Sequence, residues 1–204
     1  MRTWRFRSVA AGAVAVLAVA FTSAHGKEAA RSAPADAAAA AAMRQKISAP
    51  SRAHRKLDVF AGVWAARVSF WMDPSLPPET SEGTFEQKWM FDGRFLQQTY
   101  RGELMGKPFS GLGYLGYDNY LKKYISTWMD SAGTTIYTRT GRFDSEGKTL
   151  TLTGEVDDYV RGRTVAVRDR MTVVSPSELL YETWETGPDG QDVKILEVRY
   201  TRKS

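Results

Sequence analysis

Apolar and polar residues alternate along most of the chain after Gly62. From Trp64 to Met72 every second residue is apolar, and Arg67 and Ser69 lie between them. A period of two is typical of a β-strand with one buried face. Ten segments fit this pattern, at 63–72, 83–91, 94–103, 107–118, 122–130, 133–143, 148–157, 163–174, 178–186 and 191–202. The sequence therefore predicts an all-β domain of about ten strands.

Turn-forming residues separate these strands at hairpin spacing, as at Asp92-Gly93 and in residues 144–148. Sequential hairpins favour a closed antiparallel up-and-down barrel, because closure removes exposed strand edges. A two-sheet sandwich is the main alternative. A short helix over residues 54–61 precedes the first strand, and Gly62 lets the chain turn out of it. In the last strand, Arg202 ends an inward row, where it can stack on an indole of the first strand.

The N-terminus has the pattern of an export signal. Three arginines at positions 2, 5 and 7 precede an apolar run over residues 9–21, and small residues follow up to Ala24. We expect a Sec-type signal peptide over residues 1–24, cleaved after Ala24, and a periplasmic or secreted protein. An uncleaved anchor is the alternative, although the run is short for a membrane span. Residues 25–50 are alanine-rich and predict a linker, which alanine's propensity can make partly helical, and residues 51–204 form the barrel domain.

Composition narrows the chemistry. The chain has no cysteine, which excludes lipidation at the cleavage site, disulfides and thiolate metal sites. Its two histidines are His25 and His54, and we expect His54 to be a partly exposed helix residue. A zinc site therefore lacks enough nitrogen and sulfur ligands, and a Ser-His-Asp triad lacks a suitably placed histidine base. Removing residues 1–24 lowers the net charge from +5 to +2, with the charges interspersed. We expect no metal, cofactor or nucleic-acid partner, and no membrane contact after signal cleavage. Nothing in the sequence indicates the oligomeric state.

Asp169 is the most informative polar residue. It shares a strand face with four apolar side chains, and a carboxylate on such a face must be paired, hydrogen-bonded or protonated. It predicts a polar anchor in a cavity, or a general acid or base with a raised pKa. An internal ion pair with Arg101 or Arg139, or a bulge that turns Asp169 outward, is the structural alternative. The apolar residues of its face are Val165, Val167, Met171 and Val173.

Other strands offer further lining residues, but their inward face is ambiguous. Glu182 faces inward if Trp184 does, whereas Glu185 faces inward if Tyr181 does. One of two adjacent glutamines, at positions 97 and 98, should also face the interior. The candidate cavity lining comprises Phe95, Gln97, Tyr114, Trp128, Asp169, Glu182 and Trp184.

Several segments resemble a bacterial family known as domain of unknown function 1579, within the calycin superfamily of lipocalin-like barrels. They are residues 57–64 (LDVFAGVW), 70–74 (FWMDP), 93–98 (GRFLQQ), 113–119 (GYLGYDN), 126–130 (STWMD) and 181–190 (YETWETGPDG). The resemblance spans residues 54–203. It implies that Gly62, Trp64 and Arg202 close the barrel floor, and it implies no chemistry. The chain lacks the late-strand histidine by which a haem-binding relative of this fold holds iron.

Three functions follow from this barrel. The leading hypothesis is an exported protein that binds a small, largely apolar ligand inside it, because barrels of this size can enclose one. The second is an enzyme that uses Asp169 or Glu182 as an acid or base in the same cavity. The third is a filled barrel that acts as a structural or interaction module.

Overall fold

The computed structural model describes residues 29–158, 162–187 and 189–204. The predicted signal peptide lies outside these residues. The chain divides into two compact units, residues 1–42 and 43–204. Helix α1 (Ala29–Ser48) makes most of the predicted linker helical, as alanine's propensity allows. No helix in the described residues is long and apolar enough to span a bilayer.

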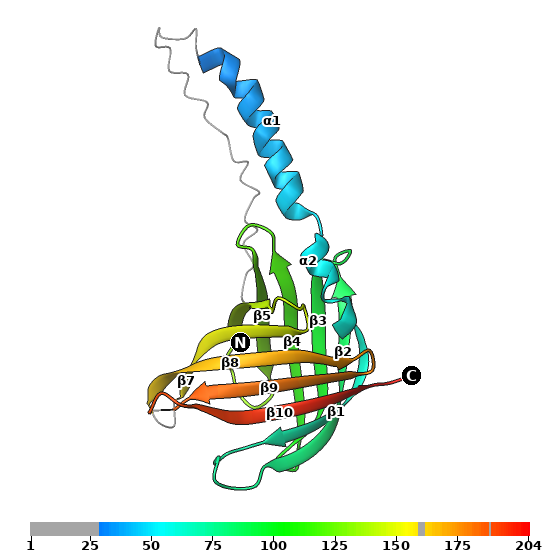
Figure 1. Cartoon of the computed structure of the whole chain (residues 1–204), viewed down its shortest axis with the longest axis vertical. Helices are drawn as coiled ribbons and strands as arrows, with labels where there is room; N and C mark the ends of the chain where they lie inside the picture. The colour runs from blue at the N-terminus through cyan, green and yellow to red at the C-terminus, as the bar shows by residue number, and fades with distance from the viewer. Residues whose placement is uncertain (1–28, 159–161, 188) are drawn as a thin grey trace, which may run out of the picture. The chain divides into compact units, whose positions relative to one another are not determined.

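The described residues form ten antiparallel strands, which close into one barrel (Figure 1). Each strand pairs with its neighbours in sequence, and β1 also pairs with β10 from Trp64–Arg202 to Phe70–Leu196. This confirms the up-and-down barrel and excludes the sandwich. The strands are β1 (Gly62–Phe70), β2 (Glu79–Met90), β3 (Phe95–Leu104), β4 (Lys107–Asp118), β5 (Lys123–Asp130), β6 (Tyr137–Phe143), β7 (Thr149–Asp158), β8 (Arg163–Ser175), β9 (Glu178–Thr186) and β10 (Asp192–Arg202).

Two strand boundaries differ from the prediction by four residues, and the others by at most two. Strand β2 begins at Glu79 instead of residue 83, because pairing with β1 starts directly after the prolines at 77 and 78. Strand β6 begins at Tyr137 instead of residue 133, because its pairing with β5 starts only at Trp128–Tyr137. Residues 131–136 therefore form a loop beside the end of β5.

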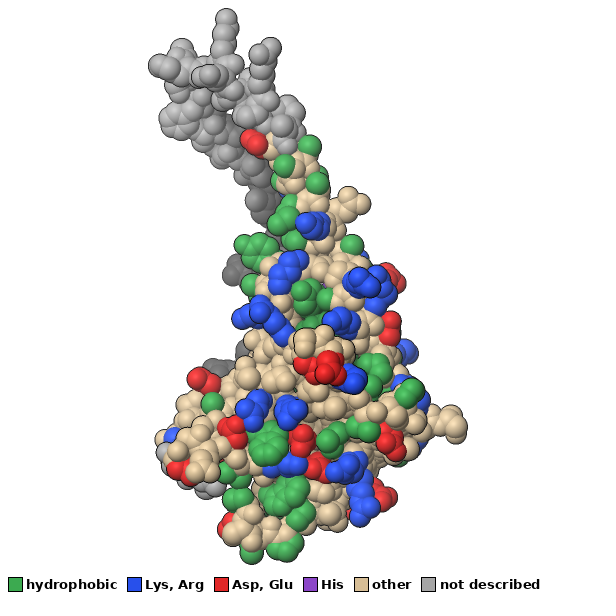
Figure 2. Space-filling view, in the orientation of Figure 1, with side chains coloured by type: hydrophobic (Ala, Val, Ile, Leu, Met, Phe, Trp, Pro, Cys, Tyr) green, Lys and Arg blue, Asp and Glu red, His purple; other side chains and the backbone are tan. Residues whose placement is uncertain are grey.

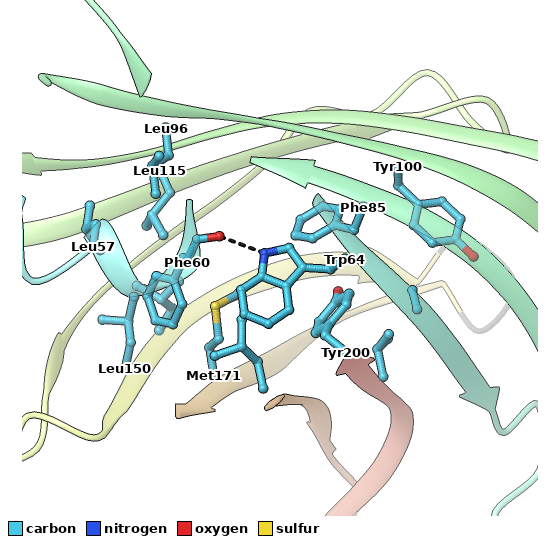
Figure 3. Packing of buried hydrophobic residues seen from close by; sticks show 14 of the residues in the cluster. Leu57, Phe60, Trp64, Phe85, Leu96, Tyr100, Leu115, Leu150, Met171 and Tyr200 are labelled. Atoms are coloured by element: carbon cyan, nitrogen blue, oxygen red, sulfur yellow. Dashed lines mark hydrogen bonds between the residues drawn. The ribbon is translucent and has the colours of Figure 1, made fainter. Parts of the chain in front are cut away.

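A short helical segment plugs one end of the barrel. Helix α2 (Arg52–Arg55) and the 3-10 turn η1 (Asp58–Phe60) lead into β1. Leu57, Phe60 and Trp64 are fully buried there and pack against side chains from strands around the barrel (Figure 3). The Trp64 Nε1 donates a hydrogen bond of 2.8 Å to the Phe60 carbonyl oxygen. The indole thus fills the barrel end and satisfies its own polar atom.

Arg202 fastens this plug to the last strand. Its guanidinium carbon lies 4.0 Å from the centre of the Trp64 ring. The same group donates hydrogen bonds to the carbonyl oxygens of Ala61 (2.8 Å), Val59 (2.9 Å) and Pro176 (3.0 Å). One side chain therefore joins the segment before β1, the β8–β9 turn and β10.

His54 is buried, so its prediction as a partly exposed residue is wrong. Its Nδ1 accepts a hydrogen bond of 2.9 Å from the backbone N–H of Ser51, which caps α2. Its ring meets the edge of Tyr117 with centroids 5.8 Å apart. Burial, followed by the positive charge of Arg94, lowers the pKa of His54 below its ordinary value.

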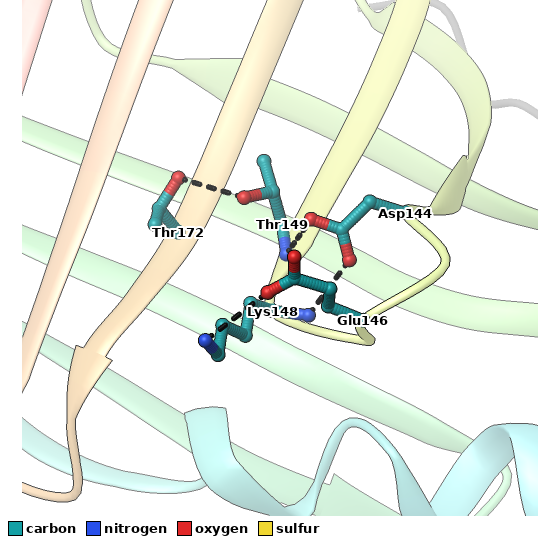
Figure 4. Close-up of polar contacts among 5 residues, drawn as sticks. All are labelled: Asp144, Glu146, Lys148, Thr149 and Thr172. Carbon is teal, nitrogen blue, oxygen red and sulfur yellow. Dashed lines mark hydrogen bonds and ion pairs between the residues drawn. The ribbon is translucent and has the colours of Figure 1, made fainter.

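Local polar contacts fix the β6–β7 turn (Figure 4). The Asp144 carboxylate accepts hydrogen bonds from the backbone N–H groups of Lys148 (2.8 Å) and Thr149 (3.0 Å). Thr149 also lies within hydrogen-bond distance of Thr172 on β8, at 3.3 Å between the hydroxyl oxygens. The residue that begins β7 is therefore linked both to the turn before it and to strand β8.

Replacing Gly62 with alanine should destabilise the barrel through the Arg202 contact. Gly62 has φ +133°, and an added Cβ would lie 2.5 Å from Arg202 Nη1. We expect the free energy of unfolding to fall by about 2–3 kcal/mol in urea titrations. Gly190→Ala is the matched control, because Gly190 has φ +79° with open space around it. It should cost about 1 kcal/mol, and equal losses in the two variants would contradict the steric argument.

Candidate functional site

The barrel encloses a cavity of about 410 Å³ between the Trp64 plug and the opposite end. We call that opposite end the mouth, and it is bordered by residues 71–78, 105–106 and 131–136. Glu103, Ala132 and Gly133 line the cavity and are exposed, so it reaches solvent at the mouth. Its apolar walls include Val68, Phe70, Phe85, Phe109, Leu115, Leu150, Leu152, Met171, Ile195, Leu196 and Val198.

Glycines under aromatic rings make room for the cavity. An added Cβ at Gly111 or Gly113 would collide with the Trp128 ring, so the indole lies against the wall of β4. Gly83 and Gly102, which pair across β2 and β3, leave room for the Tyr100 ring in a similar way. In both places an aromatic ring lies over glycine backbone. The cavity is therefore partly a product of glycine positions, which allow close approach.

A polar cluster lies in the cavity wall at Asp169, which is only 4% exposed. The Thr183 hydroxyl donates a hydrogen bond of 2.9 Å to Asp169 Oδ1, and the Tyr181 hydroxyl also donates to this carboxylate. Arg139 Nε forms an ion pair with Oδ2 at 3.1 Å. Burial raises the pKa of Asp169 above its ordinary value, against the opposing effects of Arg139, Tyr181 and Thr183. The sequence left Arg101 and Arg139 open as partners of Asp169. The structure places Arg139 beside Asp169, and Arg101 is exposed.

Buried polar atoms in this region lack well-formed hydrogen bonds among the described residues. Arg139 Nε lies beside Asp169 but outside hydrogen-bond geometry, and the Tyr100 hydroxyl has only the Ser81 side chain as a polar neighbour, also outside ideal hydrogen-bond geometry. Both side chains line the cavity. Gln98 lines it too, and its Nε2 donates to Gln87 Oε1 at 2.8 Å, which leaves the Gln87 amide nitrogen unpaired. Unpaired buried polar groups are costly and call for a partner such as a ligand or water.

Two of the predicted lining residues, Trp128 and Asp169, face the cavity. The prediction is wrong for three residues of β3 and β4. Strand β3 directs Leu96, Gln98 and Tyr100 inward, so its alternate positions 95 and 97 face outward. Phe95 is 44% exposed and covers Gly116 from outside the barrel. The residues misassigned here are Phe95, Gln97 and Tyr114.

The prediction is also wrong for two residues of β9. This strand turns Leu179, Tyr181 and Thr183 inward, which places Glu182 and Trp184 on the outer face. Glu182 forms an ion pair with Lys194 at 2.6 Å, and Lys194 Nζ lies 5.1 Å from the Trp184 ring centre. Glu182 therefore cannot act as an acid or base inside the cavity.

Sequence reasoning missed Arg139 as a lining residue, together with Tyr100, Tyr181 and Thr183. The alternation of β9 carried the signal for Tyr181, but both faces of that strand mix polar and apolar residues. Within the described residues, no group of three or more His, Asp or Glu side chains could hold a metal ion. The cluster offers an ion pair and hydroxyls, which suit recognition of a polar group on an organic ligand.

Residues 49–202 match the family described as Protein of unknown function (DUF1579), and the chain belongs to this family. The barrel resembles the crystal structure of Rv2717c from M. tuberculosis, with TM-score 0.54, 17% identity and coverage of 76% of this chain and 100% of that chain. It also resembles the S-type phycobiliprotein lyase CPES from Guillardia theta, with TM-score 0.53, 11% identity and coverage of 76% and 99%. Both likenesses show a shared barrel fold alone. No curated protein matches significantly.

Removing one partner of the buried ion pair should cost more than removing both. Asp169→Asn leaves Arg139 without a counter-charge, and we expect the free energy of unfolding to fall by about 3 kcal/mol. The double variant Asp169→Leu, Arg139→Met leaves no unpaired charge and should therefore lose less stability than Asp169→Asn, with the remaining loss coming from the Thr183 and Tyr181 hydroxyls that lose their acceptor. Urea unfolding at neutral pH measures both.

Glu146→Gln is the control for this cycle, because it breaks an exposed ion pair with Lys148. It should cost less than about 1 kcal/mol. A double variant that is as unstable as Asp169→Asn would show that the pair itself holds the wall together.

Proposed function

We propose that this member of the DUF1579 family binds a small, largely apolar organic ligand inside its barrel. The observation that carries the proposal is the cavity of about 410 Å³. Its walls are aromatic and aliphatic, and the Arg139–Asp169 ion pair forms one polar spot in them. Small-molecule sites have this character, with a mostly apolar lining and few polar groups that fix orientation. The volume also lies within the range of such sites.

The polar cluster supports a ligand with one hydrogen-bond acceptor on an apolar body. Arg139 Nε lines the cavity and has only its ion pair with Asp169, outside hydrogen-bond geometry, and the Tyr100 side chain lines the cavity with only Ser81 beside its hydroxyl as a polar partner. Asp169 balances the charge of Arg139, so the ligand needs no net charge of its own. The apolar body would gain about 25 cal/mol for each Å² that it buries against the walls.

Catalysis by an interior carboxylate has less support. Asp169 already accepts from Thr183 and Tyr181 and pairs with Arg139, which suits an anchor more than a proton carrier. The resemblance to a phycobiliprotein lyase supports only that such a barrel can serve a lyase, because the identity is 11%. The filled-barrel alternative is not favoured by a cavity that reaches solvent at the mouth.

Export forms a second part of the proposal. It is supported by the basic start, the apolar run and the small residues up to Ala24. N-terminal sequencing of the protein recovered from the extracytoplasmic fraction of its own host tests it. A chain that begins at His25 supports export and cleavage, whereas a cytoplasmic chain that retains Met1 contradicts both.

Native mass spectrometry of the protein purified from its own host tests ligand binding. We expect an additional mass that denaturation releases as an apolar organic compound. Adding the released compound at about 100 times its Kd should raise the free energy of unfolding by about 2.7 kcal/mol. A clean apo mass, with no stabilisation by any apolar compound in a thermal-shift panel, would contradict the proposal.

Filling the cavity should abolish binding while leaving the fold intact. Ser126 lines the cavity, whereas its neighbour Thr127 faces a groove on the outer surface. We expect Ser126→Phe to remove the released compound and the fluorescence of an added anilinonaphthalene sulfonate probe, because the new ring occupies the binding volume. Thr127→Phe is the matched control and should bind like the wild type. Circular dichroism checks the fold, and equal binding by both variants would place the ligand elsewhere.

A further inference from the structure

The outer surface beside the plugged end of the barrel carries a group of exposed apolar side chains that lies outside the cavity. Three segments meet there: residues 43–57, the β2–β3 turn 91–94 and the β4–β5 turn 118–123. Asn119 Nδ2 donates to the carbonyl oxygens of Ile47 (3.1 Å) and Ala49 (2.8 Å), and Arg94 Nε donates to Ser48 O (3.2 Å). These bonds hold the segments together as one surface, which we call the basic face.

Large apolar side chains project from the basic face. Tyr120 is 70% exposed, Phe91 67% and Leu121 51%. A groove of about 550 Å³ connects Tyr120 with Ile47, Phe95 and Tyr114. Soluble monomers rarely expose contiguous apolar patches, and such patches usually mark interaction sites.

The backbone conformations of the β2–β3 and β4–β5 turns place these side chains on the outside. Phe91 has φ +50°, a left-handed conformation that is unfavourable for a bulky aromatic residue. In the β4–β5 turn, Asp118 Oδ1 accepts hydrogen bonds from the backbone N–H groups of Tyr120 (2.7 Å) and Leu121 (2.8 Å). The carboxylate thus fixes a turn that displays two apolar side chains.

Charge identifies the partner. The three segments hold eight Lys or Arg and only two Asp: Arg44, Lys46, Arg52, Arg55, Lys56, Arg94, Lys122 and Lys123 against Asp92 and Asp118. Figure 2 shows Lys and Arg side chains predominating around α2 and the adjoining turns. The mouth also exposes apolar residues such as Met72 and Leu76. The described segments around it, 71–80, 103–108, 130–136, 157–158, 162–163 and 189–192, hold eight acidic residues against one lysine and one arginine. The two ends of the barrel therefore differ in charge and share exposed apolar groups.

We propose that the basic face docks on an anionic lipid surface, with Phe91, Tyr120 and Leu121 entering the headgroup region. Basic side chains next to exposed aromatic and aliphatic ones are the combination that binds such surfaces, through attraction to anionic headgroups and burial of apolar area. Burial in lipid uses the aliphatic residues Ile47 and Leu121 as well as the aromatic residues Phe91 and Tyr120, whereas nucleic-acid bases would stack on the aromatic ones alone. The acidic mouth is repelled by the same surface, so the charge sets the orientation.

The absence of cysteine allows a position-specific test in the full chain. A polarity-sensitive fluorophore is attached at Tyr120→Cys on the basic face or at Met72→Cys on the mouth. Vesicles contain phosphatidylcholine with or without phosphatidylglycerol. We expect a blue shift at position 120 with phosphatidylglycerol only, and none at position 72. The site of the signal is the readout, because the apolar run at residues 9–21 can itself bind lipid of either kind.

Charge variants complete the test. Lys122→Gln and Lys123→Gln, in the chain labelled at position 120, should each weaken binding to phosphatidylglycerol vesicles about fivefold. Lys107→Gln at the mouth is the control and should leave binding unchanged. Equal shifts at positions 72 and 120, equal response to both vesicle types, or no effect of the two lysines would overturn the proposal. Tighter binding to duplex DNA than to the vesicles would overturn it as well, by assigning the face to nucleic acid.

Discussion

The contact between Arg202 and Trp64 is the interaction on which the barrel depends. The guanidinium lies on the indole and donates hydrogen bonds to three carbonyl oxygens, two in the segment before β1 and one in the β8–β9 turn. It places β10 opposite β1 with Arg202 against Trp64, and this register decides which alternate residues of both strands face inward. Gly62 is part of the same arrangement, because any larger residue would displace the guanidinium. The cavity begins where this plug ends.

The fold was predictable because strand alternation and turn residues are local signals. The site was predictable only where one face of a strand is clearly apolar. Asp169 was placed correctly because its row in β8 is otherwise Val and Met. Gln97 was misplaced because either of two adjacent glutamines satisfied the pattern, and the register of β3 selects Gln98. Trp184 was misplaced because both faces of β9 mix polar and apolar residues, so the interior row follows from pairing with β8 and β10.

Other features depend on residues that lie far apart in sequence. The glycines of β4 became informative only when pairing placed Trp128 over Gly111 and Gly113. The basic face escaped sequence analysis for the same reason, and the expectation of no membrane contact rested on that omission. The charges of this face are interspersed along three segments, and no single segment forms a basic stripe. Hairpin stacking around the barrel brings them together, and the side chain of Asn119 ties the segments at 47–49 to the β4–β5 turn.

The plug separates the two proposed activities physically. Leu57, Phe60 and Trp64 fill the barrel between the basic face and the cavity, so a group that docks outside does not enter the ligand volume. Lipid docking would then leave the mouth, with its acidic segments, directed away from the membrane surface. A ligand would enter and leave from the solvent side. This arrangement suits a barrel that is held at a surface and exchanges its ligand with a soluble source, because direct extraction from the bilayer would require the mouth to face the lipid.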